Sequence, residues 1–273
     1  MAVHRRCRVC GTFYPSDRRD LEQFIASLVE RVDRRASRGS VRGLVSPHAG
    51  YVYSGFTAAH GYALLEGLHF DSVVIMAPSH VEYFDGISVF DGDAYETPFG
   101  SVSIDAELRE EIVRSSPAIR SSGAGHGDEH AIEVQLPFLQ HLLGSFMILP
   151  IVVGDQRREY SMELGDVLGE ILRNRNALLV ASTDLSHYHS YEEAMRIDKR
   201  MIDDVSSFAF HDLMTHLETG EAEACGGGPT VAVMSALKSL GAKKFEVLHH
   251  CNSGDVTGDH HRVVGYLSAV ALG

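Results

Sequence analysis

The sequence contains, at residues 73–80, the stretch Val-Val-Ile-Met-Ala-Pro-Ser-His. Its first five residues are apolar, and a continuous apolar run is typical of a strand that is buried on both faces. Strands of this kind belong to parallel sheets that carry helices on either side. We therefore expect a buried parallel strand here, with His80 just beyond its carboxyl end.

Two further apolar runs of the chain lead into a histidine. Residues 43–47 precede His48, and residues 177–186 precede His187. In open α/β sheets the ligand crevice lies beyond the carboxyl ends of the parallel strands. One histidine after a strand is usually a loop residue that hydrogen-bonds locally, but three of them indicate a metal site or an acid–base site at one rim of the sheet.

Length and composition favour an α/β fold and exclude several classes of protein. The chain has 273 residues, of which 44% are hydrophobic and 22% charged, which is ample for a core and argues against disorder. We expect a single domain over residues 1–273, since no repeat or linker divides the chain; two small domains are the alternative. The formal charge of −13 with no basic stripe argues against nucleic-acid binding.

The compartment is predicted from what the chain lacks. Residues 1–14 contain no apolar segment of the secretory type, and no stretch of about 20 apolar residues could span a membrane. Four cysteines in a chain of this length do not make a disulfide framework. We therefore expect a cytoplasmic protein with no membrane partner.

Alternating hydrophobic patterns predict a mostly parallel or mixed central sheet between two helix layers. Helices are expected over 17–38, 55–68, 105–115, 129–143 (disturbed by Pro137), 158–173, 190–208, 210–219 and 229–240. Strands are expected over 41–46, 72–77, 87–90, 146–153, 177–182, 244–251 and 263–271. Residues 91–100 read as a loop, and the Ser/Gly-rich residues 116–128 as a mobile active-site loop.

The first candidate site combines His48, His80 and Cys225. Cys225 precedes three glycines and the expected start of a helix, whose backbone N–H groups would favour the thiolate that binds metals. Two imidazoles and one thiolate leave open positions on a metal, as in catalytic rather than closed structural sites. Zinc, iron and copper all accept this donor set. The alternative is that Cys225 is only a small buried hydrophobe.

Two further groups are candidates for proton transfer or substrate contact. Asp184 could orient an imidazole, and His187 at the same rim could shuttle a proton; helix capping by Asp184 or Ser186 is the alternative. His130 and Glu133 are three apart and would share a helix face, so that His130 could contact a substrate. Glu129 reads as a charge at a helix start.

Cys7 and Cys10 form a weaker motif, Cys-x-x-Cys. A structural zinc site would need a second such pair, and a thioredoxin-like motif would follow a strand inside a βαβ unit. Here the pair sits near the start of the chain. The sequence assigns it no role.

Six blocks of the sequence resemble the Memo family, known in bacteria and archaea as AmmeMemoRadiSam system protein B. They are Gly11–Pro15, Ser46–Gly55, Pro78–His80, Asp128–Pro137, Ser182–His187 and Ala224–Pro229. They occur in the family order and cover the chain from about residue 10 to its end. Two positions depart from the pattern: Cys10 stands where a small residue is frequent, and Val81 where some members carry a second histidine.

The resemblance implies an α/β domain related to the class III extradiol dioxygenases, which use non-haem iron. It implies that His48, His80 and Cys225 are the metal ligands, and that Asp184 and His187 line the same pocket. A thiolate here replaces the carboxylate of the dioxygenases, so ring cleavage does not follow from the fold. The family name also implies a link to radical-SAM and AMMECR1-domain-type proteins.

The expected function is that of a metal-binding protein that holds non-haem iron, with a redox role and an unidentified substrate. Copper and zinc are the alternative metals. One alternative function is a non-catalytic module that holds a small molecule or a peptide in the same pocket. The other is a zinc-dependent hydrolase.

Overall fold

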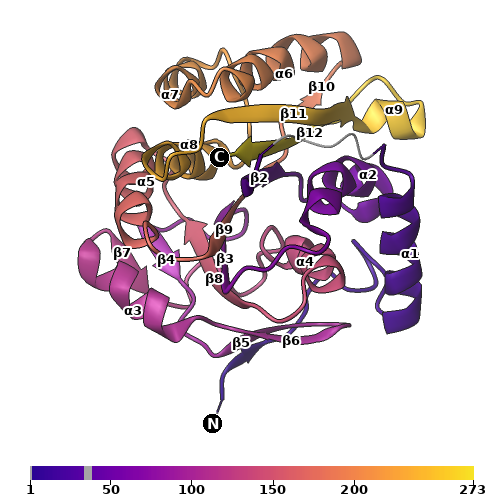
Figure 1. Cartoon of the computed structure of the whole chain (residues 1–273). Coiled ribbons are helices and arrows are strands. Elements are labelled where there is room, and N and C mark those ends of the chain that lie inside the picture. Colours follow the sequence, from indigo (N-terminus) through magenta and orange to yellow (C-terminus); the bar gives the residue numbers. More distant parts are fainter. Residues whose placement is uncertain (1, 34–38) are drawn as a thin grey trace.

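The computed structural model describes residues 2–33 and 39–273 of the chain (Figure 1). Within these residues, nine strands form one sheet in the order β10-β12-β2-β9-β3-β8-β4-β7, with β11 paired to β12. These strands are β2 (Val41–Ser46), β3 (Ser72–Pro78), β4 (Ile87–Val89), β7 (Ile119–Ser121), β8 (Met147–Val153), β9 (Ala177–Ser182), β10 (His187–His189), β11 (Lys244–Asn252) and β12 (Val263–Leu272).

The centre of the sheet is parallel, as the apolar runs predict. Strands β2, β9, β3 and β8 pair in parallel, whereas β12 runs antiparallel to β2 and β4 antiparallel to β8. All seven residues of β3 are buried. Because successive side chains of a strand point to opposite faces, Val73 and Ile75 pack in one core while Val74 and Met76 pack in the other.

Helices cover both faces of this sheet, and the prediction of an α/β fold with a mixed sheet between two helix layers is confirmed (Figure 1). One layer contains α1 (Arg18–Glu30), α2 (Tyr51–Tyr62) and α4 (Leu136–Leu142). The other contains α3 (Ala106–Ser115), α5 (Arg158–Ile171), α7 (Phe210–Thr219) and α8 (Gly227–Ser239), with α6 (Tyr191–Ser206) packed on β11 and β12. A short helix, α9 (Ser253–Thr257), joins β11 to β12.

Three short strands form a second sheet at the lower end of the molecule in Figure 1. Within the described residues its order is β1 (His4–Arg5), β5 (Ala94–Thr97) and β6 (Gly100–Ser103). The prediction of a loop over 91–100 is therefore wrong, because β5 pairs with β6 as a hairpin and with the N-terminal β1. The pairing of β1 with β5 joins residues far apart in the chain and therefore leaves no local signal.

Several predicted boundaries also differ from the structure. Helix α1 begins where expected, because the Asp17 carboxylate accepts hydrogen bonds from two amides of its first turn, but it ends at Glu30; residues 34–38 lie outside the described part of the chain. Helix α2 begins at Tyr51 rather than residue 55. The segment 116–128 contains strand β7 and the fully buried His126, so it is not a featureless loop.

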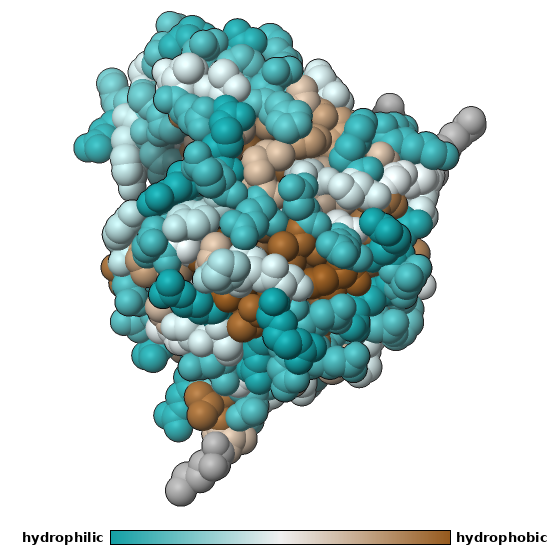
Figure 2. All heavy atoms as spheres, turned by 90° about the vertical axis from the view of Figure 1, so that its left-hand side faces the viewer, coloured by the Kyte–Doolittle hydropathy of each residue, from teal (hydrophilic) through white to brown (hydrophobic). Residues whose placement is uncertain are grey.

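The outer surface of the helix layers is mainly polar. Figure 2 shows the left-hand side of Figure 1, where hydrophilic residues cover most of the surface and the strongest hydrophobic colour lies in the middle of the face, with a smaller patch near the lower end. The apolar sides of the helices thus point toward the sheet. Among the described residues, we find no helix that combines the length and the apolar character needed to cross a bilayer.

Candidate metal site

The structure brings the three predicted metal ligands together at the carboxyl edge of the parallel strands. His48 lies two residues beyond β2, His80 two residues beyond β3, and Cys225 two residues before α8. One donor atom from each of them lies within 4.8 Å of the other two. This is the rim at which the apolar runs predict a crevice.

The buried His48 is held so that one of its ring nitrogens carries no proton. Its Nδ1 lies 2.8 Å from Ser182 Oγ. That hydroxyl donates its proton to the Ala131 carbonyl at 2.7 Å and accepts from Gln135 Nε2 at 2.8 Å. Since the hydroxyl proton is used, His48 Nδ1 must donate to Ser182, which leaves Nε2 unprotonated. This nitrogen lies 3.1 Å from Cys225 Sγ.

Cys225 differs from the prediction in its protonation. Burial and the neighbouring Asp184 carboxylate raise the pKa of the thiol, although the backbone N–H of Asp184 donates to Sγ at 3.2 Å. The expectation that the helix start favours the thiolate is therefore wrong for the metal-free protein, because burial outweighs the backbone dipoles. A metal ion would have to displace the proton from sulfur.

His80 is oriented by Glu129, a residue that we expected only as a charge at a helix start. The Glu129 carboxylate accepts from the backbone N–H of His80 at 2.6 Å and lies 3.0 Å from its Nδ1. Burial alone would raise the pKa of Glu129, but the hydrogen bonds and charge of His80 lower it to about 2. The carboxylate is therefore ionised and accepts a hydrogen bond from Nδ1–H, so Nε2 of His80 is the nitrogen available to a metal.

His130 completes a triangle of imidazoles. Its ring centre lies 5.5 Å from that of His48 and 5.0 Å from that of His80. The ring centres of His48 and His80 are 5.1 Å apart. Atoms of His80, Glu129 and His130 form a second group that could hold an ion. The predicted helix over 129–143 begins only at Leu136, after a 3-10 turn over Glu133–Gln135, so His130 does not share a helix face with Glu133.

Glu133 instead points away from the site into a buried ion pair. Its side chain and that of Arg5 are 0% and 3% exposed, and Arg5 Nη1 lies 2.6 Å from Glu133 Oε2. The same guanidinium donates to the backbone carbonyls of Glu129 and, at 2.6 Å, His126. Arg5 therefore fixes the turn that carries Glu129 and His130.

Asp184 supports the backbone of His48 and does not cap a helix. Its Oδ1 accepts from the backbone N–H of His48 at 2.8 Å. Burial raises the pKa of this carboxyl to about 7, and the hydrogen bond from His48 only partly offsets that effect. Asp184 thus contacts the backbone of His48 through its side chain and Cys225 through its own backbone N–H, and its role in orienting an imidazole stays a prediction.

His187 is the first residue of β10 and is half-buried. Its backbone N–H donates to Glu223 Oε1 at 2.9 Å. Burial lowers the pKa of its imidazole, and its charge would interact with those of His48 and His80. His187 therefore lies close enough to His48 and His80 for their charges to interact, and its lowered pKa keeps the ring neutral at pH 7, the state required of a proton acceptor.

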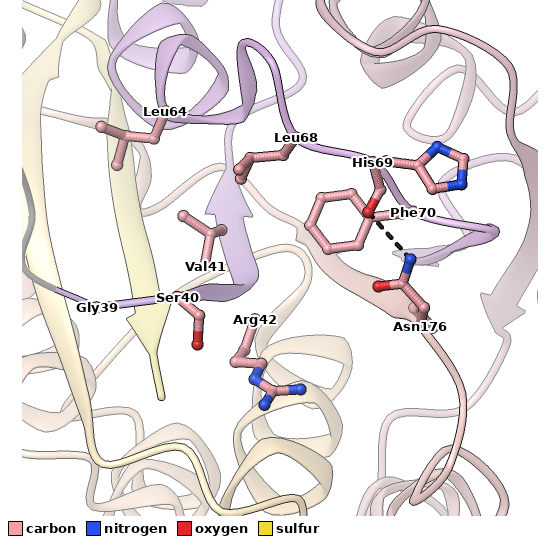
Figure 3. Close-up of a pocket in the computed structure, with 10 residues that line it drawn as sticks. Gly39, Ser40, Val41, Arg42, Leu64, Leu68, His69, Phe70 and Asn176 are labelled. Atoms are coloured by element: carbon pink, nitrogen blue, oxygen red, sulfur yellow. Dashed lines mark hydrogen bonds between the residues drawn. The ribbon is translucent and has the colours of Figure 1, made fainter.

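A separate pocket lies at the opposite edge of the sheet and contains none of the predicted site residues. Its volume is about 420 Å³, and its lining includes Val41, Arg42, Leu68 and Phe70. Figure 3 shows the Phe70 ring near Val41 and Leu68, and a hydrogen bond of 3.1 Å from Asn176 Nδ2 to the His69 carbonyl. This edge therefore combines apolar side chains with polar ones and contains none of the candidate ligands.

Comparison with known proteins agrees over almost the whole chain. The model of the Memo family, described as Memo-like protein, matches residues 5–270. A MEMO1 family protein of Methanosarcina mazei is 38% identical, covering 97% of this chain and 98% of its own. Another MEMO1 family protein, from Aquifex aeolicus, is 39% identical, covering 98% and 99%.

A solved structure supports the fold alone. An uncharacterized protein of Escherichia coli K12 matches with a TM-score of 0.55 at 15% sequence identity, and the match covers 86% of this chain and 100% of that one. An identity this low carries no statement about the reaction.

Proposed function

This chain belongs to the Memo family, and we propose that it is a metal-binding protein with a redox role, in which His48, His80 and Cys225 hold one ion. The observation that carries the proposal is the convergence of two imidazoles and one thiol, with donor atoms within 4.8 Å of one another. Each imidazole uses Nδ1 for a hydrogen bond to a supporting side chain, the arrangement that is typical of metal-ligating histidines.

We propose iron, which the resemblance to the dioxygenase-related family implies, with copper and zinc as alternatives. Nitrogen and sulfur donors suit all three metals and disfavour magnesium and calcium. A bound ion would supply Lewis-acid or one-electron chemistry to oxygen, superoxide or a small organic substrate. Three protein ligands would leave positions open for such a molecule.

The other residues of the site would control protons and orientation. Ser182 and Glu129 hold the rings of His48 and His80 in one tautomer. Asp184 holds the His48 backbone. The half-buried His187, whose pKa is lowered by burial, would accept a proton from a substrate at the rim.

Metal analysis of protein purified without a metal-binding tag is the experiment that tests this proposal. We expect about one ion per chain, and we expect Cys225→Ser to bind copper and iron more weakly while its weak binding of magnesium is unchanged, because the thiolate is the soft donor. Cys251→Ser, which removes the other free thiol, is the matched control. Unchanged copper and iron binding in Cys225→Ser would refute the ligand assignment.

The choice between an enzyme and a binding module depends on His187. If the protein is an enzyme, His187→Ala should keep its metal and lose roughly 10²–10⁴-fold in turnover, measured as oxygen consumption. The exposed His69, at the opposite edge of the sheet, provides the control variant His69→Ala. Modest changes in ligand affinity without loss of turnover would favour the binding module, and amide or ester hydrolysis by the zinc form would favour a hydrolase. The cytoplasmic location and the link to radical-SAM and AMMECR1-domain-type proteins stay predictions.

A further inference from the structure

Cys7 and Cys10 are joined by a disulfide that the proposed metal site does not use. Their Cα atoms are 5.9 Å apart, and both residues are half-buried rather than enclosed. The other two cysteines, Cys225 and Cys251, are free thiols. The pair lies in the segment 4–14, which we call the N-terminal hook.

The disulfide closes a small ring around two backbone amides that bind a buried carboxylate. Inside that ring, the N–H of Arg8 donates to Glu133 Oε2 at 2.8 Å, and the N–H of Val9 donates to Glu133 Oε1 at 3.0 Å. The hook also supplies the Tyr14 hydroxyl, which donates to Oε1 at 2.6 Å. Glu133 is fully buried, so these bonds and the Arg5 ion pair must compensate the loss of its hydration.

The N-terminal hook contacts residues that lie beside, or belong to, each of the three imidazole-bearing residues of the site. Arg5, which pairs with Glu133, donates to the backbone carbonyl of Glu129, and Glu129 in turn holds His80. The ring of Phe13 packs on His130, with ring centres 4.9 Å apart.

A third contact reaches the start of α2. The Phe13 carbonyl accepts from the N–H of Tyr51 at 2.8 Å, three residues after His48. A change in the Cys7–Cys10 ring would therefore reach the metal ligands through short chains of buried polar contacts.

We propose that Cys7 and Cys10 are a redox-active pair that exchanges with a dithiol reductant, and that their oxidation state sets how firmly the metal site is held. The second half of this proposal rests on the proposed metal binding. The disulfide restricts the two amides to the geometry that Glu133 requires; opening the ring restores conformational freedom to residues 7–10 and weakens both hydrogen bonds.

The exchange is balanced in atoms and electrons. A thiolate of the reductant attacks one sulfur of the pair, the S–S bond breaks, and a mixed disulfide forms. The second thiolate of the reductant then displaces the remaining cysteine, so the reductant becomes a disulfide and Cys7 and Cys10 become two thiols after taking up two protons. The exposed Arg6 and Arg8 flank Cys7 and would stabilise the departing thiolate.

The redox step is tested on the metal-free protein. We would equilibrate it in mixtures of oxidised and reduced dithiothreitol, alkylate the free thiols, and locate the modified cysteines by mass spectrometry. We expect one reversible two-electron transition at Cys7 and Cys10, in wild type and in Cys251→Ser alike. An irreversible transition, or unfolding on reduction, would show that the disulfide is only structural and would overturn the proposal.

The coupling to the metal site is tested with ferrous ion alone, after the dithiothreitol has been removed under anaerobic conditions. We expect the reduced protein to bind the ion about tenfold more weakly, the lower range for loss of an outer support of a metal ligand. Amide exchange at Arg8 and Val9 should accelerate on reduction. The double variant Cys7→Ser/Cys10→Ser should have the iron affinity of the reduced protein, and this affinity should not change when the reductant is added. If the variant does not fold, the comparison of oxidised and reduced wild type is sufficient.

The outcomes separate this inference from the proposed function. Equal iron affinity in both oxidation states would overturn the coupling and leave metal binding intact. Absence of iron binding in both states would sink the proposed function, and the thiol titration together with amide exchange would still decide whether the pair is redox-active.

Discussion

The two sides of the candidate metal site are built in different ways. On the buried side, His48 and Cys225 lie at the ends of regular elements, β2 and α8, and are 3.1 Å apart. On the open side, His80 also follows a strand, β3, but its side chain is 31% exposed, and His130 is carried by an irregular segment. The buried side is supported by the sheet itself, whereas the open side is supported by Glu129 and, behind it, by Arg5.

The two sides of the site therefore depend on different parts of the fold for their stability. The buried side needs only correct pairing of the central strands, because β9 places Ser182 beneath His48. The open side depends on one guanidinium, whose partners Glu129 and Glu133 are more than a hundred residues away in the sequence. Removal of that guanidinium should make the open side more mobile and leave the structure of the buried side unchanged.

The largest expected effect comes from removing Arg5. Arg5→Ala leaves the Glu133 carboxylate buried without its cation, which should lower the free energy of unfolding by about 3–5 kcal/mol. Urea denaturation followed by circular dichroism measures the change. A loss below about 1 kcal/mol would show that the open side has another support.

Arg8→Ala is the matched control for this prediction. The Arg8 guanidinium forms only an exposed ion pair with Asp128 at 3.4 Å, and its backbone N–H, which binds Glu133, is retained in the variant. We expect a change within about 1 kcal/mol.

A smaller effect is expected when Glu129 loses its charge. Glu129→Gln removes the ionised acceptor of His80 Nδ1 and should weaken iron binding by about 10–100-fold, as for other supports of metal-ligating histidines. Isothermal titration under anaerobic conditions gives the affinities. The neighbouring exposed carboxylate supplies the control Asp128→Asn, for which no change is expected.

Asp184→Asn makes the same change on the buried side. An asparagine oxygen can still accept from the His48 backbone, and the raised pKa of Asp184, about 7, means that the carboxyl is partly neutral near neutral pH. We therefore expect a smaller loss of iron affinity than for Glu129→Gln. The reverse order would show that the buried side carries most of the binding energy.

The smallest effect is a dependence of stability on pH through His126, whose carbonyl anchors Arg5. Burial lowers the pKa of His126 to about 3, so the ring is neutral in the folded protein, whereas the unfolded chain takes up a proton below pH 6.5. Stability should therefore fall as the pH drops below 6.5, by about 1 kcal/mol between pH 7 and 5.5 from this residue.

Denaturation curves of wild type and His126→Gln across this pH range test the prediction, because the variant should lose this share of the pH dependence. An equal slope for both proteins would mean that His126 is protonated in the fold or contributes through other groups.

Much of the fold can be predicted from the sequence because the central strands carry their own signal. The predicted strands over 41–46 and 177–182 have the same bounds as β2 and β9, since apolar runs of this length have few alternatives. Strand β10, by contrast, was not expected. It is only three residues long and forms by pairing with β12, far away in the chain.

The residues of the candidate site divide in the same way, into those that have a local sequence signal and those that have none. His48, His80, Asp184 and Cys225 could be found because they follow strands or precede a helix. The support of the open side could not be found, since no local pattern distinguishes the buried Glu129 from the exposed Asp128 beside it. The spacing of His130 and Glu133 and the family resemblance over Asp128–Pro137 both marked this stretch, but neither assigned Glu129 a contact with His80.

Strand β12 has a consequence for how the protein is made on the ribosome. It lies beside β2 in the sheet, yet residues 47–262 are translated between the two strands. At about 5–20 residues per second, that delay is on the order of 10–40 s, during which β2 waits without this neighbour. Strand β9, the other neighbour of β2, is translated earlier, so the edge of β2 that later pairs with β12 is the one that must be protected from other strands during this time.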